Sequence, residues 1–99
     1  MIGKEMNTLE LDKRKTDVLA AIVDVYINTG GPVASKSVAL MLGNEYSSAT
    51  IRNDMAYLFD LGFLEQPHTS AGRIPSHLGL RYYLNIIMKA KPLTGEEKR

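Results

Sequence analysis

The sequence predicts a mainly α-helical fold with one small β-hairpin, and three observations support this fold class. Apolar residues recur every three or four positions in four stretches of the chain, which is the period of an amphipathic α-helix. The second and third of these stretches are separated by only a tight turn. Two short strand-forming runs around a polar loop follow them directly. Helix, short extended segment, helix, turn, helix, strand, loop, strand and helix is the order of a winged helix-turn-helix.

The first helix is predicted to begin after Asp12 and to end before Gly30. The Asp12 carboxylate can accept a hydrogen bond from a free amide of the first turn. Gly30 tolerates a left-handed cap, and Pro32 cannot continue the helical hydrogen bonds. Residues 32–34 are expected to be extended and able to form one β-bridge. The apolar face of this helix comprises Leu11, Val18, Leu19, Ile22, Val23, Tyr26 and Ile27.

Two further helices are predicted on either side of the turn at residues 45–46. Ser35 is a suitable cap for the second helix, residues 36–42, which would turn Val38, Ala39 and Leu42 inward. Ser47 or Ser48 would cap the third helix, which runs to about Leu61, with Gly62 where a terminal glycine is favoured. The apolar face of the third helix comprises Ile51, Met55, Leu58 and Leu61.

The hairpin and a fourth helix complete the expected fold. Residues 63–66 and 73–75 are predicted to be strands, joined by the polar loop 67–72. Ser76 is a suitable cap for the fourth helix. Tyr82 on this helix is either exposed, as an interface residue would be, or partly buried, which is commoner for a tyrosine. The side chains expected on the buried face of this helix are Leu80, Tyr83, Leu84 and Ile87.

Composition narrows the class of protein. The chain has no cysteine, so it can form neither a disulfide framework nor a thiolate metal site. No apolar run reaches the roughly 18 residues of a membrane helix, and residues 1–10 lack the apolar centre of a signal peptide. We therefore expect a cytoplasmic protein without a membrane partner. The net charge is only +1, so any binding of nucleic acid must depend on where the charges lie.

No enzyme, cofactor or metal site is expected. His68 and His77 are nine residues apart and lack a cysteine partner, which is poor spacing for metal ligands. The sequence contains neither the Gly-x-Ser-x-Gly turn of a serine hydrolase nor a glycine-rich phosphate-binding loop.

The exposed face of the third helix suits a helix that reads DNA. Arg52 can make two hydrogen bonds to guanine, and Asn53 can make two to adenine. Ala49 and the Thr50 methyl group can contact a thymine methyl, and Tyr57 flanks this face. Ser47 and Ser48, with the free amides of the first turn, can bind a phosphate. The alternative is an ordinary solvated helix face, with Asp60 an unsuitable neighbour for phosphates.

The loop between the strands is the second candidate DNA contact. It contains His68, Thr69, Ser70 and Gly72, followed by Arg73. Gly72 permits a tight turn or a close backbone approach, and Arg73 can enter the minor groove or hold a phosphate. The alternative is a plain hairpin loop with one surface arginine. From residue 47 to residue 75 the two cations, Arg52 and Arg73, face three acids, Asp54, Asp60 and Glu65.

Four more cations lie in the first turns of two helices. Lys13, Arg14 and Lys15 open the first helix, where they oppose the helix dipole, so they form either a solvated turn or a phosphate contact. Lys36, in the first turn of the second helix, is a better phosphate candidate because that helix crosses the DNA backbone in this motif.

Two stretches carry a family resemblance: SATIRNDM at residues 48–55 and LEQPHTSAGRIP at residues 64–75. Together they resemble the signature of the HrcA heat-inducible transcription repressors, and residues 11–84 fit that family. The resemblance implies binding to double-stranded DNA at an inverted-repeat CIRCE operator and repression of chaperone operons. It also implies self-dimerisation and a chaperonin partner in the full-length protein.

The expected domains follow from this resemblance and from the polar ends of the chain. Residues 1–10 are predicted to be a flexible arm, residues 11–90 the DNA-binding domain, and residues 91–99 the start of a linker to a missing C-terminal region that dimerises and senses heat. Two other functions remain open, a winged-helix module that binds proteins and an RNA-binding domain.

Overall fold

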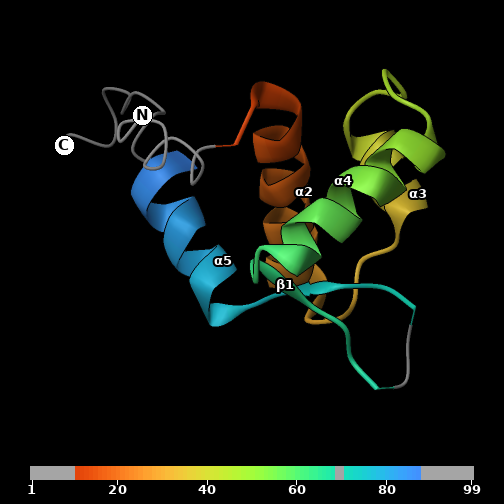
Figure 1. Ribbon diagram of the computed structural model, residues 1–99. Coiled ribbons are helices and arrows are strands. Elements are labelled where there is room, and N and C mark those ends of the chain that lie inside the picture. The colour runs from red at the N-terminus through yellow and green to blue at the C-terminus, as the bar shows by residue number, and fades with distance from the viewer. Residues whose placement is uncertain (1–10, 69–70, 88–99) are drawn as a thin grey trace, which may run out of the picture.

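The computed structural model describes residues 11–68 and 71–87, and its elements follow the predicted order (Figure 1). The predicted arm 1–10, loop residues Thr69 and Ser70, and the linker 91–99 lie outside this part of the chain. The elements are α2 (Lys13–Thr29), α3 (Ser35–Met41), α4 (Ser48–Asp60), β1 (Leu64–Glu65), β2 (Ile74–Pro75), α5 (His77–Tyr82) and the π-helical turn η1 (Tyr83–Ile87). The mainly helical fold with one small hairpin is confirmed.

Local capping chemistry sets the ends of α2. The Asp12 carboxylate accepts a hydrogen bond from the Lys15 backbone amide at 2.8 Å, as predicted. At the other end, Gly30 is left-handed with φ 74°, and its amide donates to the Tyr26 carbonyl at 2.7 Å. Both predicted ends of the first helix are therefore confirmed.

The predicted cap of α3 is wrong, whereas that of α4 is confirmed. Ala34, not Ser35, precedes the first turn of α3 and offers no side-chain hydrogen bond, so the helix runs one residue earlier than expected. The Ser47 hydroxyl caps α4 by accepting a hydrogen bond from the Thr50 amide at 3.1 Å. The Ser35 prediction failed because the extended backbone that precedes a helix can begin the turn without a polar side chain.

The hydrophobic core lies where α2, α3, α4 and the hairpin meet. Its largest fully buried side chains are Val18, Leu19, Ile22, Val23, Val33, Val38, Ile51 and Leu58. One residue predicted to face the core behaves otherwise. Ile27 is exposed, because α2 extends past its packing partners and residues 27–29 are all exposed. Leu42, predicted to point inward, follows the last turn of α3 and packs, partly buried, against the core.

A minimal sheet joins the hairpin to the segment before α3. β1 and β2 are antiparallel, with Leu64 opposite Pro75 and Glu65 opposite Ile74. Arg73, predicted to extend the returning strand, instead bridges Val33 through two backbone hydrogen bonds of 2.8 and 3.0 Å. The predicted single bridge in residues 32–34 is therefore confirmed, and both strands are shorter than expected.

The final helix packs differently from its prediction. Tyr83 is buried as expected, but Leu84 is 58% exposed. Residues 83–87 form a π-helical turn, which has more residues per turn than an α-helix and so breaks the 3.6-residue spacing on which that face was predicted. Tyr82 is half-buried, the commoner of its two expected placements, and its ring lies 4.9 Å from that of Phe63.

No helix in the described ranges is both long enough and apolar enough to cross a membrane.

Candidate nucleic-acid interface

The predicted division of α4 into two faces is confirmed. Ile51, Met55 and Leu58 are buried against the core. Arg52 and Asn53 are exposed on the other side. The remaining exposed residues of α4 are Ala49, Ala56, Tyr57, Phe59 and Asp60. One helix therefore offers solvent an arginine and an asparagine at adjacent positions, near its N-terminal end.

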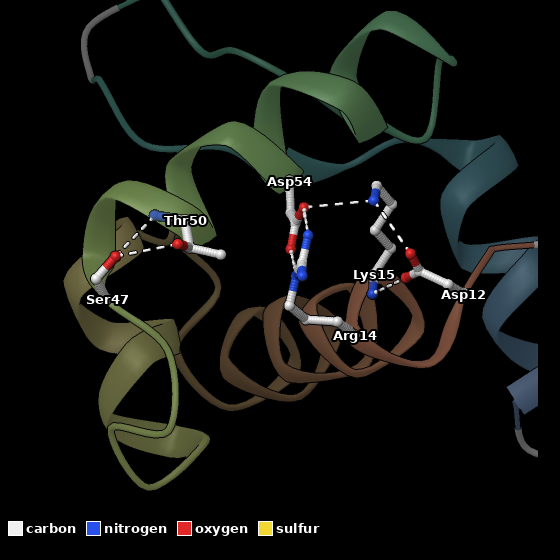
Figure 2. Close-up of polar contacts among 6 residues, drawn as sticks. All are labelled: Asp12, Arg14, Lys15, Ser47, Thr50 and Asp54. Atoms are coloured by element: carbon white, nitrogen blue, oxygen red, sulfur yellow. Dashed lines mark hydrogen bonds and ion pairs between the residues drawn. The ribbon is translucent and has the colours of Figure 1, made fainter.

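Asp54 is the important residue that sequence reasoning missed. It lies on the buried face of α4 and is 2% exposed. Arg14 from α2 reaches it with two hydrogen bonds, Nε to Oδ2 at 2.5 Å and Nη2 to Oδ1 at 2.9 Å, and Lys15 Nζ lies 3.6 Å from Oδ1 (Figure 2). The signal was present, since residues 51, 54, 55 and 58 form one helical stripe, and an acid in that stripe requires a cation.

The cations that open α2 are thus engaged within the protein. Lys13 pairs with Asp17 at 2.9 Å, and Lys15 with Asp12 at 3.3 Å (Figure 2 shows the latter). The hydrogen bonds and charge of Asp54 raise the pKa of Arg14 further above its usual range. The interpretation of this cluster as a solvated turn holds for Lys13, whose side chain is 86% exposed, and is wrong for Arg14. A phosphate contact from Arg14 would compete with its bond to a buried carboxylate.

This pairing changes the charge of the exposed surface. The sequence count set two arginines against three acids between residues 47 and 75. One of those acids, Asp54, is buried and compensated by Arg14. The exposed part of residues 47–75 is therefore less acidic than the count implied, and its exposed acids are Asp60 and Glu65.

The start of α4 and the first turn of α3 border one groove. A hollow of about 400 Å³ is lined by residues from both helices and from the turn between them, among them Lys36, Tyr46, Ser47 and Ser48. Lys36 is exposed, as a phosphate contact requires. The Ser47 hydroxyl donates to Thr50 Oγ1 at 3.1 Å and accepts from the Thr50 amide, so it is already engaged as a cap.

A second groove separates α4 from the base of the hairpin loop. It holds about 290 Å³ and is lined by Ala34, Ser35, Arg52, Met55, Ala56, Ala71, Gly72 and Arg73. A Cβ atom on Gly72 would lie 3.0 Å from both the Pro32 Cβ and the Val33 carbonyl oxygen. The close backbone approach predicted for Gly72 is thus confirmed. His68, at the start of the loop, is exposed.

Two aromatic side chains at this surface contact cations. Lys15 Nζ lies 5.0 Å from the ring centre of Tyr57, which remains 43% exposed. The Arg73 guanidinium lies 5.0 Å from the ring centre of Phe59 and donates from Nη1 to the carbonyls of Ala71 and Gly72, at 2.8 and 3.3 Å. The role of Arg73 in DNA contact stays a prediction, and its side chain is already engaged with the protein.

Comparison with known proteins identifies the fold and the family. The sequence profile described as "Winged helix-turn-helix transcription repressor, HrcA DNA-binding" matches residues 10–81. The chain belongs to the HrcA family. The HrcA match includes α2, α3, α4, the hairpin and most of α5, and hence every candidate contact residue.

Curated HrcA relatives are similar across most of this chain. The "Heat-inducible transcription repressor HrcA" of Syntrophobacter fumaroxidans is 54% identical over 89 residues, which are 90% of this chain and 26% of the relative. That of Desulforamulus reducens is 48% identical over 90 residues, which are 91% of this chain and 26% of the relative. The chain therefore spans about a quarter of the length of these relatives.

One solved structure has the same arrangement. It is described as "Crystal structure of a hypothetical protein at 2.2 A resolution", and it superposes with a TM-score of 0.74 at 48% sequence identity. The superposition covers 87% of this chain and 28% of the other.

Proposed function

We propose that this chain is the DNA-binding part of a cytoplasmic heat-inducible repressor and that it binds one half of an inverted-repeat operator. One observation carries the proposal. Arg52 and Asn53 are exposed side by side near the N-terminal end of α4, while the neighbouring acid, Asp54, is buried and neutralised by Arg14. A recognition helix needs such hydrogen-bonding side chains at the end that enters the major groove.

Base readout is assigned to α4. Arg52 donates to O6 and N7 of a guanine, and Asn53 bonds N6 and N7 of an adenine. Ala49 and the Thr50 methyl group lie one turn earlier and contact a thymine methyl. Tyr57 flanks the same face one turn later.

Contacts to the DNA backbone are assigned to the elements around α4. Lys36 and Ser48 border the groove that joins α3 to α4, where a phosphate can also meet the first amides of the 13-residue helix α4. Ser47 contributes as the cap that fixes those amides. The loop at residues 67–72 is the wing of this fold. Through His68, Thr69, Ser70 and Gly72 it contacts the groove of the DNA next to the groove that α4 enters.

The full-length protein is proposed to act as a dimer. An inverted repeat presents two half-sites related by a twofold axis, and each half-site takes one recognition helix. The proposed operator is of the CIRCE type, the regulated genes are chaperone operons, and the chaperonin system is the proposed regulatory partner.

A gel-shift experiment tests the proposal. The 99-residue chain is titrated against a duplex with the family-type inverted repeat and against a scrambled duplex of equal length and composition. We expect tighter binding to the repeat and a steep loss of affinity as salt rises, because each neutralised phosphate releases counterions. Equal binding to both duplexes would contradict specific readout.

A second candidate function is supported by one observation. Leu61, Phe63, Leu78 and Tyr82 line an apolar hollow of about 180 Å³ between the end of α4 and α5, which suits a module that binds proteins. Binding through such a surface would depend only weakly on salt, whereas DNA binding would depend on it steeply.

A further inference from the structure

The side chain of Arg73 makes its contacts within the protein, at the base of the wing. Its Nη1 donates to the Ala71 carbonyl at 2.8 Å and to the Gly72 carbonyl at 3.3 Å. Its guanidinium carbon lies 5.0 Å from the ring centre of Phe59, on the last turn of α4. The Nε atom is buried and has no hydrogen-bond partner in the part of the chain that the structure describes. This side chain therefore joins the wing to the recognition helix.

The backbone of the same residue is fixed to a third segment. Arg73 and Val33 exchange two backbone hydrogen bonds, of 2.8 and 3.0 Å, next to the start of α3. The adjacent Gly72 approaches Pro32 and Val33 so closely that a Cβ atom would lie 3.0 Å from each. The base of the wing is thus held on one side by residues 32–33 and on the other by Phe59 of α4.

This geometry differs from that of an arginine that extends toward a phosphate. An arginine that binds a phosphate directs two guanidinium N–H donors, side by side, toward solvent. In Arg73, by contrast, Nη1 donates to the carbonyls of Ala71 and Gly72, and the planar guanidinium lies near the ring of Phe59. An arginine suits this arrangement better than a lysine, because its flat guanidinium can stack and still donate in its plane.

We infer that Arg73 is a positioning residue, which locks the wing against the recognition helix through Phe59 and neutralises no phosphate itself. The lock fixes the width of the groove between α4 and the base of the wing, the groove that Arg52 also lines. The inference rests on the proposed function, since wing and recognition helix must hold one spacing to contact adjacent grooves of a duplex.

Two substitutions and their combination test the lock by DNA binding. Phe59→Leu removes the ring without changing charge, Arg73→Met removes the guanidinium, and Arg81→Met on α5 is the matched control. We expect Phe59→Leu and Arg73→Met each to lower affinity about 3- to 10-fold, the range of one cation–π contact expressed as an affinity ratio. The double variant should lose little more than either single variant. The slope of log affinity against log salt should stay unchanged in all of them.

Hydrogen exchange tests the lock without DNA. The Val33 and Arg73 amides, which form the backbone bridge, should exchange about 3- to 10-fold faster in both single variants and at the wild-type rate in Arg81→Met.

The two measurements separate the possible failures. A salt slope reduced by about one unit in Arg73→Met, with Phe59→Leu unaffected, would show a phosphate contact and overturn the inference. A loss confined to duplexes with A·T-rich flanks would show minor-groove insertion and overturn it as well. Unchanged amide exchange in both variants would also overturn it. If the wild-type chain does not distinguish operator from scrambled DNA, the proposed function is refuted. Hydrogen exchange at Val33 and Arg73 then decides by itself whether Arg73 and Phe59 hold the wing against α4.

Discussion

Arg14 and Asp54 join α2 to α4 through two hydrogen bonds between residues 40 positions apart. The Asp54 carboxylate is almost completely buried, whereas the arginine side chain remains 36% exposed. The pair lies on the same face of α4 as the buried side chains of Ile51, Met55 and Leu58, and together they hold the helix with Arg52 and Asn53 toward solvent. The contacts on the inside of the helix therefore determine which side chains are presented on the outside.

Arg14→Met is expected to lower the thermal midpoint of unfolding by several degrees, because it leaves a buried carboxylate without its main partner. Lys13→Met is the matched control, since its partner Asp17 and its own side chain are solvent-accessible, and such pairs contribute little. Circular dichroism melting curves measure both. Equal midpoints for the two variants would contradict the structural role of the Arg14–Asp54 pair.

Arg52→Ala and Asn53→Ala should each weaken binding to the operator by about 1–3 kcal/mol and weaken binding to random DNA much less. Fluorescence anisotropy with both duplexes measures the two losses. Arg81→Ala, an exposed arginine on α5, controls for the loss of one positive charge. Equal losses on operator and random DNA would mean that Arg52 and Asn53 contact only phosphates.

The isolated 99-residue chain is expected to be monomeric and to bind the full operator weakly. It carries one recognition helix, and an inverted repeat is bound tightly only when a second linked domain raises the effective concentration at the other half-site. Analytical ultracentrifugation at micromolar concentration measures the state of association. A tight dimer of this chain would refute the prediction.

Gly79→Ala should lower the free energy of unfolding by about 1–3 kcal/mol, although alanine is intrinsically the better helix former. A Cβ atom at this position would lie 2.1 Å from the backbone carbonyl oxygen of Phe63, so α5 would have to move away from the hairpin. Gly31→Ala is the matched control, because its Cβ atom would meet nothing within 4 Å. Urea unfolding curves that agree for the two variants would show that α5 can shift freely.

Low pH should destabilise the N-terminal end of α2, because it protonates the Asp12 carboxylate that caps this helix. The backbone hydrogen bond from Lys15 is the main cause that lowers the pKa of the Asp12 carboxyl below its ordinary value of 3.8. A carboxyl whose pKa is lower in the folded state stabilises the fold above its unfolded pKa, and this stabilisation is lost as pH falls through the folded value.

Asp12→Asn separates the charge from the cap, because asparagine caps a helix without titrating. Below about pH 4, the free energy of unfolding of the wild-type chain should fall more steeply with falling pH than that of Asp12→Asn. Asp12→Ala should cost about 1 kcal/mol at neutral pH. Identical pH profiles for wild type and Asp12→Asn would rule out a contribution from the Asp12 charge.

The elements could be predicted from the sequence because their ends depend on local chemistry. Asp12, Gly30, Ser47 and Ser76 each cap a helix through groups within four residues of their own position, as predicted, whereas the cap predicted at Ser35 does not occur. The faces of α4 followed from helical period alone. The same local rules failed at η1, where a π-helical turn changes the period and turns Leu84 toward solvent.

The electrostatics of the site could not be predicted in this way. The partner of Asp54 lies on another helix, and the Arg73 guanidinium contacts the ring of Phe59, fourteen positions earlier in the sequence. A count of charges along the sequence treats Asp54 and Arg73 as if neither contacted another side chain. Only the packing of the elements shows which cations are already engaged and which, like Lys36, remain exposed.

The hydroxyl of Tyr82 accepts a hydrogen bond from the Leu11 amide at 3.3 Å, across 71 residues. The segment that precedes α2 is therefore tied to α5, and it lies three residues before Arg14, whose hydrogen bonds hold α4. The start and the end of the described domain thus meet next to the residue that orients the exposed face of α4.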